Sequence, residues 1–292
     1  MTTRTLTWML AAVFFAGLAA VATPARAELF TASPITDPVA GSPFPQWYQD
    51  FADPAASADA NPDYGTGLNA GGLKLELCLD ENGLCLLELP TPGAPVLFPS
   101  NFGPEVFWWA GGAAIPNPNG LAALVLAIEG AFDNEDPVTG NPVVFGRVRI
   151  RVDVDIPGTY TVTHPYGVEV FTVDAVGDGT EINFSDDFGA ADLNNFNVVL
   201  GSNVGPFLFW NAELPVTAVA TPGVFYIGDP AVEHQVLGSP LGTNFFRIQG
   251  PPGSNLGGSP APNIIQTDLF SISGKVFTGG GNTAPVAVAD AA

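Results

Sequence analysis

The two cysteines of the chain, Cys78 and Cys85, lie in the segment LELCLDENGLCLLEL, residues 75–89. Two thiols alone cannot complete a tetrahedral zinc site, and the Cys-X-X-Cys spacing of redox enzymes is absent. In an oxidising compartment a disulfide is the expected state, with two free thiols as the alternative. A hairpin that pairs Asp80 with Gly83 would bring the cysteines opposite each other, with leucines on its other face.

Acidic side chains gather at two places in the sequence and are candidate calcium ligands. Calcium prefers hard oxygen ligands in flexible loops, although neither group follows the spacing of an EF-hand. Simple solvation of the carboxylates is the alternative, since charged loop residues commonly face water. No other cofactor is expected. The two groups are Asp133, Glu135 and Asp136 in one hairpin loop, and Asp186, Asp187 and Asp192 further along the chain.

Three arginines, Arg147, Arg149 and Arg151, occupy alternate positions of one expected strand and therefore share a face. A guanidinium group is planar and can bind an anionic group through two parallel hydrogen bonds. An anionic surface glycan or the acidic patch of a protein partner could therefore dock on this face. Neutralisation by acids of a neighbouring strand, such as Glu129, is the alternative.

Aromatic side chains supply two candidate sugar-binding surfaces. Trp47 and Tyr48 lie outside the repeated pattern described below, so they are free to form a surface platform for a sugar ring. A second set occupies equivalent places in the two halves of the chain, which favours packing in the core over ligand binding. That set consists of Phe107, Trp108, Trp109, Phe209 and Trp210.

Catalytic signatures are absent from the sequence. The two histidines, His164 and His234, lie in turn-like or loop-like segments without an HExxH pattern, and no GxSxG elbow occurs. Ser239 lies in a Gly-Ser-Pro stretch that is typical of a turn. A glycoside-active enzyme needs only two carboxylates that face each other in a cleft, so it is kept as a minor alternative. We therefore expect a protein without enzymatic activity.

The elements that must position these residues are β-strands. Residues 147–156, RVRIRVDVDI, alternate strictly between apolar and charged, which is typical of a strand with one buried face. Residues 124–132 contain Val, Ile and Gly beside a turn-rich stretch and favour a second strand over a helix. Residues 158–174 are expected to form strands around a Pro-Tyr-Gly turn. Short strands separated by Gly and Pro predict an all-β protein of antiparallel β-sandwiches.

The order of several short segments repeats along the chain. GPEVFW at 103–108 corresponds to GPFLFW at 205–210, and four further segments match in the same order. We interpret this order as an internal duplication. It predicts a first β-sandwich domain over 28–157 and a related second domain over 158–277. A glycine-rich linker and the start of a repeat-like strand are expected over 278–292.

The N-terminus has the pattern of a secretory signal peptide. Residues 1–27 contain an early positive charge, a short apolar run and a final Ala-Arg-Ala. The run is short for a membrane span of about 20 apolar residues, and no later segment approaches that length. A secreted, extracellular or cell-surface protein is therefore expected. Removing Arg4 and Arg26 with the leader would change the formal net charge from −21 to −23, which argues against nucleic acid as a partner.

Several segments together carry a resemblance to one group of bacterial proteins. They are PQWY (45–48), the Cys78 to Cys85 hairpin, FGRVRIRVDV (145–154), GTYTVTHPYG (158–167), GKVFTGG (274–280), and Thr283 to Ala287 with Asp290. They resemble exported bacterial β-sandwich proteins that stand ahead of tandem immunoglobulin-like or cadherin-like repeats. The resemblance implies a bacterial surface context and carries over no catalytic or binding residue. The expected function is non-catalytic, with a structural, adhesive or assembly role; a carbohydrate-binding module is the alternative.

Overall fold

The computed structural model shows an all-β chain in which two antiparallel sheets pack as a β-sandwich, as the alternation of apolar and polar residues predicted. The structure describes residues 29–34, 41–50, 72–134, 136–138, 140–177, 179–211, 216–217, 223–258 and 262–279. The expected signal peptide, the repeat-like segment over 283–290 and Glu135 lie outside these residues. Within them, we find no helix with the length and apolar character needed to cross a membrane.

The larger sheet contains twelve strands. Its main path follows, in spatial order, β1 (Leu29–Ala32), β2 (Trp47–Asp50), β3 (Lys74–Glu76), β16 (Leu269–Val276), β4 (Glu105–Ala114), β5 (Ala122–Phe132), β6 (Pro142–Val152) and β9 (Ile182–Phe188). Four short strands attach beside β16, and they are β10 (Phe209–Trp210), β11 (Val216–Thr217), β12 (Phe225–Tyr226) and β13 (His234–Leu237). Both candidate sites described below lie on this sheet.

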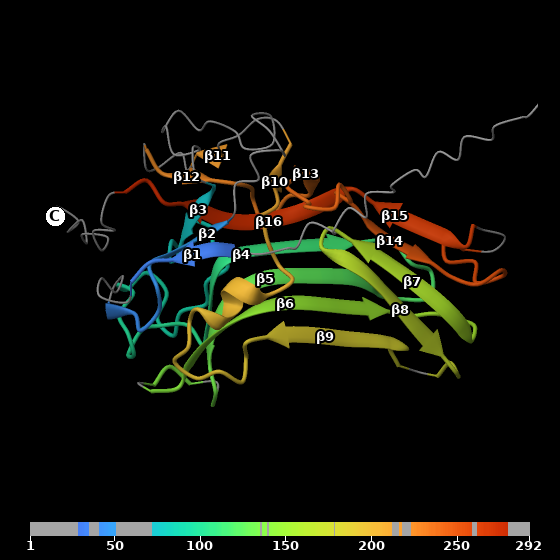
Figure 1. Ribbon diagram of the computed structural model, residues 1–292, viewed down its shortest axis with the longest axis horizontal. Coiled ribbons are helices and arrows are strands. Elements are labelled where there is room, and N and C mark those ends of the chain that lie inside the picture. The colour runs from blue at the N-terminus through green and yellow to red at the C-terminus, as the bar shows by residue number, and fades with distance from the viewer. Residues whose placement is uncertain are drawn as a thin grey trace, which may run out of the picture.

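The smaller sheet has four strands and covers one face of the larger one. Its spatial order is β15 (Ile264–Thr267), β14 (Phe246–Gln249), β7 (Gly158–His164) and β8 (Gly167–Val173). Figure 1 shows β7 and β8 running obliquely across β4, β5 and β6. A short 3-10 helix, η3 (Val198–Gly201), also packs against β6 and buries Val199.

A hydrophobic core fills the space between the sheets. Leu126 of β5 and Ile150 of β6 contribute to it from the larger sheet, and Val162 of β7 and Ile248 of β14 contribute from the smaller one. The strand predicted for 124–132 is confirmed by β5, and the one predicted for 147–156 is confirmed as far as Val152, with buried positions alternating from Arg147 to Val152. Because the apolar side of β6 faces this core, its arginines must lie on the outer face of the larger sheet.

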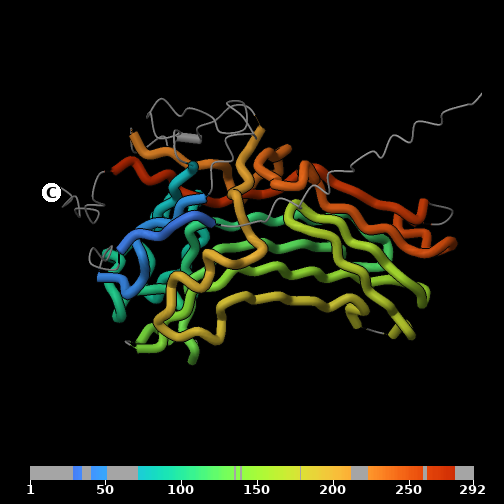
Figure 2. Tube along the Cα trace, viewed as in Figure 1, coloured from blue at the N-terminus to red at the C-terminus, as the bar shows by residue number. Residues whose placement is uncertain are grey.

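The strand β16 lies in the middle of the larger sheet although it comes last among the described strands. It pairs with β3, where Lys275 lies opposite Glu76, and with β4, where Ser273 lies opposite Ala110. Figure 2 shows this red strand beside the blue and cyan strands from the start of the chain. Strands from both sides of residue 157 therefore share one sheet and one core. The internal duplication stays a prediction.

A buried carboxylate joins three distant segments at the end of β2. Asp50 accepts hydrogen bonds from the backbone N–H groups of Leu73, at 2.6 Å, and Phe207, at 3.0 Å. Gly72 has a φ of +99°, and a Cβ there would lie 2.2 Å from the carbonyl oxygen of Asp50, so only glycine can occupy this position. Burial raises the pKa of Asp50 to about 7, although both hydrogen bonds lower it.

Candidate functional site

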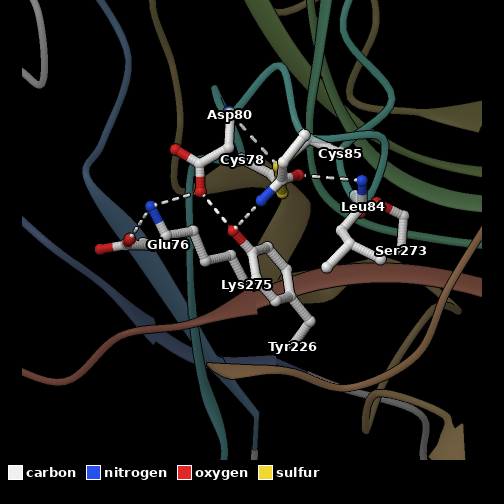
Figure 3. Close-up of a disulfide and its surroundings, with 9 residues drawn as sticks. Glu76, Cys78, Asp80, Leu84, Cys85, Tyr226, Ser273 and Lys275 are labelled. Carbon is white, nitrogen blue, oxygen red and sulfur yellow. Dashed lines mark hydrogen bonds and ion pairs between the residues drawn. A yellow bond between two sulfur atoms is a disulfide. The ribbon is translucent and has the colours of Figure 1, made fainter. Parts of the chain in front are cut away.

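Four polar side chains meet beside the disulfide, and we call them the lysine cluster. Glu76 of β3 and Tyr226 of β12 each lie directly opposite Lys275 of β16 in the strand pairing. Asp80 follows β3 and reaches the same place from the side (Figure 3). Strand register therefore fixes three of the four residues, and the loop after β3 must fix the fourth.

Short polar contacts connect the members of the lysine cluster. Lys275 Nζ lies 2.9 Å from Glu76 Oε1 and 2.8 Å from Asp80 Oδ2. Tyr226 donates its hydroxyl proton to Asp80 Oδ2 at 2.5 Å and accepts a hydrogen bond from Asn82 Nδ2 at 2.8 Å. The side chain of Lys275 is 6% exposed, whereas that of Asp80 is 32% exposed. The cluster therefore meets solvent on the Asp80 side.

Burial and charge set the proton affinities in this cluster. Burial raises the pKa of Glu76, and the ammonium group of Lys275 partly opposes that rise. Burial alone would lower the pKa of Lys275, but the carboxylates of Glu76 and Asp80 raise it above its ordinary value. Burial, followed by the hydrogen bond to Asp80, raises the pKa of Tyr226, so this hydroxyl stays a donor. Glu76 is thus a stronger base than an exposed carboxylate, and it contacts an ammonium group directly.

The predicted disulfide between Cys78 and Cys85 is present, with the two Cα atoms 5.4 Å apart. It packs against Tyr226 in a small buried cluster. The backbone N–H of Asp80 points at Cys85 Sγ at 3.4 Å, so the disulfide holds the backbone of the residue that reaches Lys275 (Figure 3). An open hollow of about 490 Å³ borders the same loop and is lined in part by Asp80, Cys85 and Glu88.

The hairpin register predicted around this disulfide is wrong. Within the described loop the two arms beside the turn form no strand pair, and Leu77 is buried whereas Leu86 is 40% exposed. The N–H of Leu77 donates instead to the carbonyl of Gln46 at 2.8 Å, and that of Cys78 donates to the carbonyl of Phe107 at 2.9 Å. Neighbouring parts of the larger sheet therefore use the backbone groups that a hairpin would need.

Arg147 is neutralised on the outer face of the larger sheet, as the alternative interpretation of the arginines predicted. Its guanidinium group contacts Glu129 at 2.8 Å and Asp187 at 2.7 Å. Glu129 is fully buried, and burial raises its pKa to about 8. Arg147 opposes this rise, whereas Glu105 and Asp187 add to it. Because Glu129 is shut off from solvent, Glu129 and Asp187 do not form the pair of facing carboxylates in a cleft that a glycoside-active enzyme needs.

Arg149 and Arg151 lie further along β6 and are partly exposed. Among the described residues neither forms an ion pair; both contact the hydroxyl of Ser185 on β9, at 3.4 and 3.3 Å. Their neighbours on β5 are Val125 and Ala123, whose side chains are too short to cover them. We call this part of the outer surface the arginine face. It presents two cations without acidic partners in the described chain.

The surface platform predicted from Trp47 and Tyr48 is not formed. Tyr48 is fully buried, and its hydroxyl donates to the carbonyl of Phe196 at 2.7 Å. Trp47 is partly exposed, but its ring contacts Phe277, with centroids 5.9 Å apart, and the ammonium of Lys74 lies 4.4 Å above it. Because side chains alternate along β2, the two residues point in opposite directions.

The paired aromatic residues are divided between the core and the surface. Trp108, Trp109 and Phe209 are buried, which confirms core packing for these three. Trp210 is partly exposed, stacks on His234 with ring centroids 5.1 Å apart, and has an indole N–H without a hydrogen-bond partner. Of the tryptophans in this set, Trp210 is therefore the one whose ring a ligand can reach.

The described acidic residues of the two groups are not assembled into a calcium site. Asp133, Asp136 and Asp192 are exposed, and Asp187 is held by Arg147. Within the described part of the chain, no group of three or more His, Cys, Asp or Glu residues is placed to hold a metal ion. Calcium binding by either group stays a prediction.

The lysine cluster was missed by the sequence analysis. Lys275 is the single charged residue in the apolar and small-residue stretch LFSISGKVF, 269–277. A cation in such a stretch is a signal for a buried, paired charge, because an unpaired one would be costly to bury. Its acidic partners come from a segment about 200 residues earlier, so the sequence offers no direct pointer to them.

Comparison with known proteins adds no further assignment. No protein-family model, curated protein or solved structure matches the chain. The functional proposal therefore rests on the arginine face and the disulfide.

Proposed function

We propose that the protein is a non-catalytic exported module of a bacterial surface, with an adhesive or assembly role, and that its arginine face binds an anionic partner. One observation carries the proposal. Arg149 and Arg151 lie without acidic partners among the described residues, on an open sheet face of a chain whose formal net charge is −21. The disulfide supports an oxidising compartment. The internal duplication is part of the same proposal, since surface proteins are commonly built from repeated units.

The chemistry of this face favours a polymer with repeating negative charges. Residues two positions apart on a strand are separated by about 7 Å, so Arg149 and Arg151 present two guanidinium groups in a row. A surface polysaccharide with carboxylate or sulfate groups can meet both at once through charge-assisted hydrogen bonds. A single small anion gains less, because it cannot meet both guanidinium groups at a spacing of about 7 Å at once.

Binding of a uronic-acid polysaccharide to the double variant Arg149→Ser/Arg151→Ser tests the proposal. We expect affinity to fall at least about tenfold, since each charge-assisted hydrogen bond contributes roughly 1.5–3 kcal/mol. Arg247→Ser on the smaller sheet is the matched control, because it removes a cation that pairs with Gln266 and no acid. Equal binding by the wild type and the double variant would refute a role for this face.

Trp210 supports a second candidate function, a module that binds neutral sugars. Its partly exposed ring, stacked on His234, matches the way aromatic side chains hold a sugar ring. On an array of neutral glycans, Trp210→Ala should abolish any signal while Trp47→Ala, whose ring is covered by Lys74, should keep it. Binding that survives Trp210→Ala would exclude this candidate.

A further inference from the structure

We propose that the lysine cluster forms an intramolecular amide bond between Nζ of Lys275 and the side-chain carboxyl group of Asp80. This covalent cross-link is independent of the proposed function and would stand or fall separately. The geometry carries it, because the amine lies 2.8 Å from one carboxylate and 2.9 Å from a second one, in a site where its side chain is 6% exposed.

Each member of the cluster has a distinct role in this reaction. Lys275 is the nucleophile. Asp80 is the acceptor, because Tyr226 already donates a hydrogen bond to its Oδ2 and can polarise the carbonyl group. Glu76 is the proton acceptor, since it contacts the ammonium group and is the more buried of the two acids. Asn82 holds the Tyr226 hydroxyl in place through its own hydrogen bond.

The reaction balances without any added reagent. The Lys275 ammonium transfers one proton to the Glu76 carboxylate and becomes a neutral amine, and Glu76 passes that proton to the Asp80 carboxylate. The amine attacks the protonated carboxyl carbon of Asp80, a C–N bond forms, the C–OH bond breaks, and the amine loses a second proton to the departing hydroxyl. The products are one amide and one water molecule, and Glu76 returns to its carboxylate form.

The surroundings favour this step in three ways. Holding two groups in contact replaces a bimolecular reaction by an intramolecular one, for which effective concentrations reach about 10⁵–10⁸ M. Burial raises the pKa of Glu76 and makes its carboxylate a better proton acceptor for the Lys275 ammonium, although the two carboxylates also raise the pKa of Lys275. The water that is released can leave through the hollow that borders Asp80. Because the bond forms once in each molecule, a small population of the neutral pair is sufficient.

The backbone around Asp80 is held in position for the same step. The disulfide between Cys78 and Cys85 spans this residue, and the Asp80 N–H points at Cys85 Sγ. Lys275 is fixed from both sides by the pairing of β16 with β3 and β12. The amide would therefore join the central strand of the larger sheet covalently to the loop after β3, next to an existing covalent link.

Intact mass measurement on the full chain, exported to an oxidising compartment and then reduced and alkylated, tests the proposal. We expect the wild type to be lighter than its sequence by one water molecule. Peptide mapping should yield a branched peptide that joins the segment of Asp80 to the segment of Lys275. A wild-type chain of full mass, with its disulfide formed, would show an ion pair only and would overturn the inference.

Variants separate the cross-link from other losses of water. Lys275→Arg keeps the positive charge but cannot form the amide, so it should have full mass, and Glu76→Gln should lower the cross-linked fraction. Lys74→Arg is the matched control: this lysine lies over the Trp47 ring and should leave the mass deficit unchanged. A deficit that persists in Lys275→Arg would indicate a cyclised aspartate and would overturn the inference. The branched wild-type peptide decides the question even if a variant fails to fold.

Discussion

Replacing the buried carboxylate Asp50 by asparagine should change how stability depends on pH. In the wild type both carboxylate oxygens accept backbone N–H groups, those of Leu73 and Phe207. The amide of asparagine offers one acceptor and turns an NH₂ group toward the other N–H. One buried donor therefore loses its partner, at a cost of roughly 1–3 kcal/mol.

The titration of Asp50 sets the size and the sign of the pH effect. Burial raises its pKa from 3.8 to about 7 in the folded protein, which corresponds to roughly 4 kcal/mol at 1.36 kcal/mol per unit. Because the folded pKa is the higher one, this contribution is fully present below about pH 4 and is lost as the pH rises to about 7. Asp50→Asn does not titrate. Its disadvantage of roughly 1–3 kcal/mol should therefore shrink over this range and change sign between about pH 4.5 and pH 6.

Urea unfolding of both proteins between pH 4 and pH 8, followed by the fluorescence of the buried Trp108 and Trp109, measures this difference. Other titrating groups, including Glu129, are common to both proteins and cancel in the comparison. Asp136→Asn removes an exposed carboxylate, so its difference from the wild type should stay flat. A difference between wild type and Asp50→Asn that is constant across the whole range would refute the reasoning.

Two further substitutions test the outer face and the disulfide. Arg147→Ala leaves Glu129 buried without its cation and should lower the free energy of unfolding by about 3 kcal/mol. Arg149→Ala should change it by less than about 0.5 kcal/mol. Equal effects of the two variants in urea unfolding would contradict the pairing of Arg147 with Glu129. Cys78→Ser removes a cross-link to Cys85 that closes a short loop and should cost about 2 to 3 kcal/mol. An unchanged thermal midpoint for Cys78→Ser would show that the link does not restrict the unfolded chain.

Local patterns in the sequence were sufficient to predict much of the larger sheet. Strict alternation over 147–156 identified β6 and the direction of its side chains. The same alternation, carried to β5, placed Glu129 on the side of the arginines, where it contacts Arg147. The disulfide followed from the number and spacing of the cysteines together with the expected compartment. These features depend on residues close in sequence or on composition, which a sequence displays directly.

Features that depend on distant strands could not be predicted in the same way. The predicted hairpin register is wrong because the backbone N–H groups of Leu77 and Cys78 donate to Gln46 and Phe107, and no local signal in the sequence identifies those partners. The prediction that Tyr48 lies at the surface is wrong because its burial depends on packing against Trp108, with the two ring centroids 4.8 Å apart. For the lysine cluster, the sequence shows only the isolated cation Lys275. Its partners are brought to it because β16 inserts between β3 and β4.

The central place of β16 has a consequence for how the chain reaches its folded state. Its Ser273 bonds to a residue 189 positions earlier, and its Ser271 to one 159 positions earlier. Such high contact order makes folding slow, because a large loop must close before these contacts form. Until residues 269–276 arrive, β3 and β4 both expose unpaired edges, which are prone to aggregate. A chain that emerges N-terminus first during synthesis must therefore be protected until this late strand has emerged.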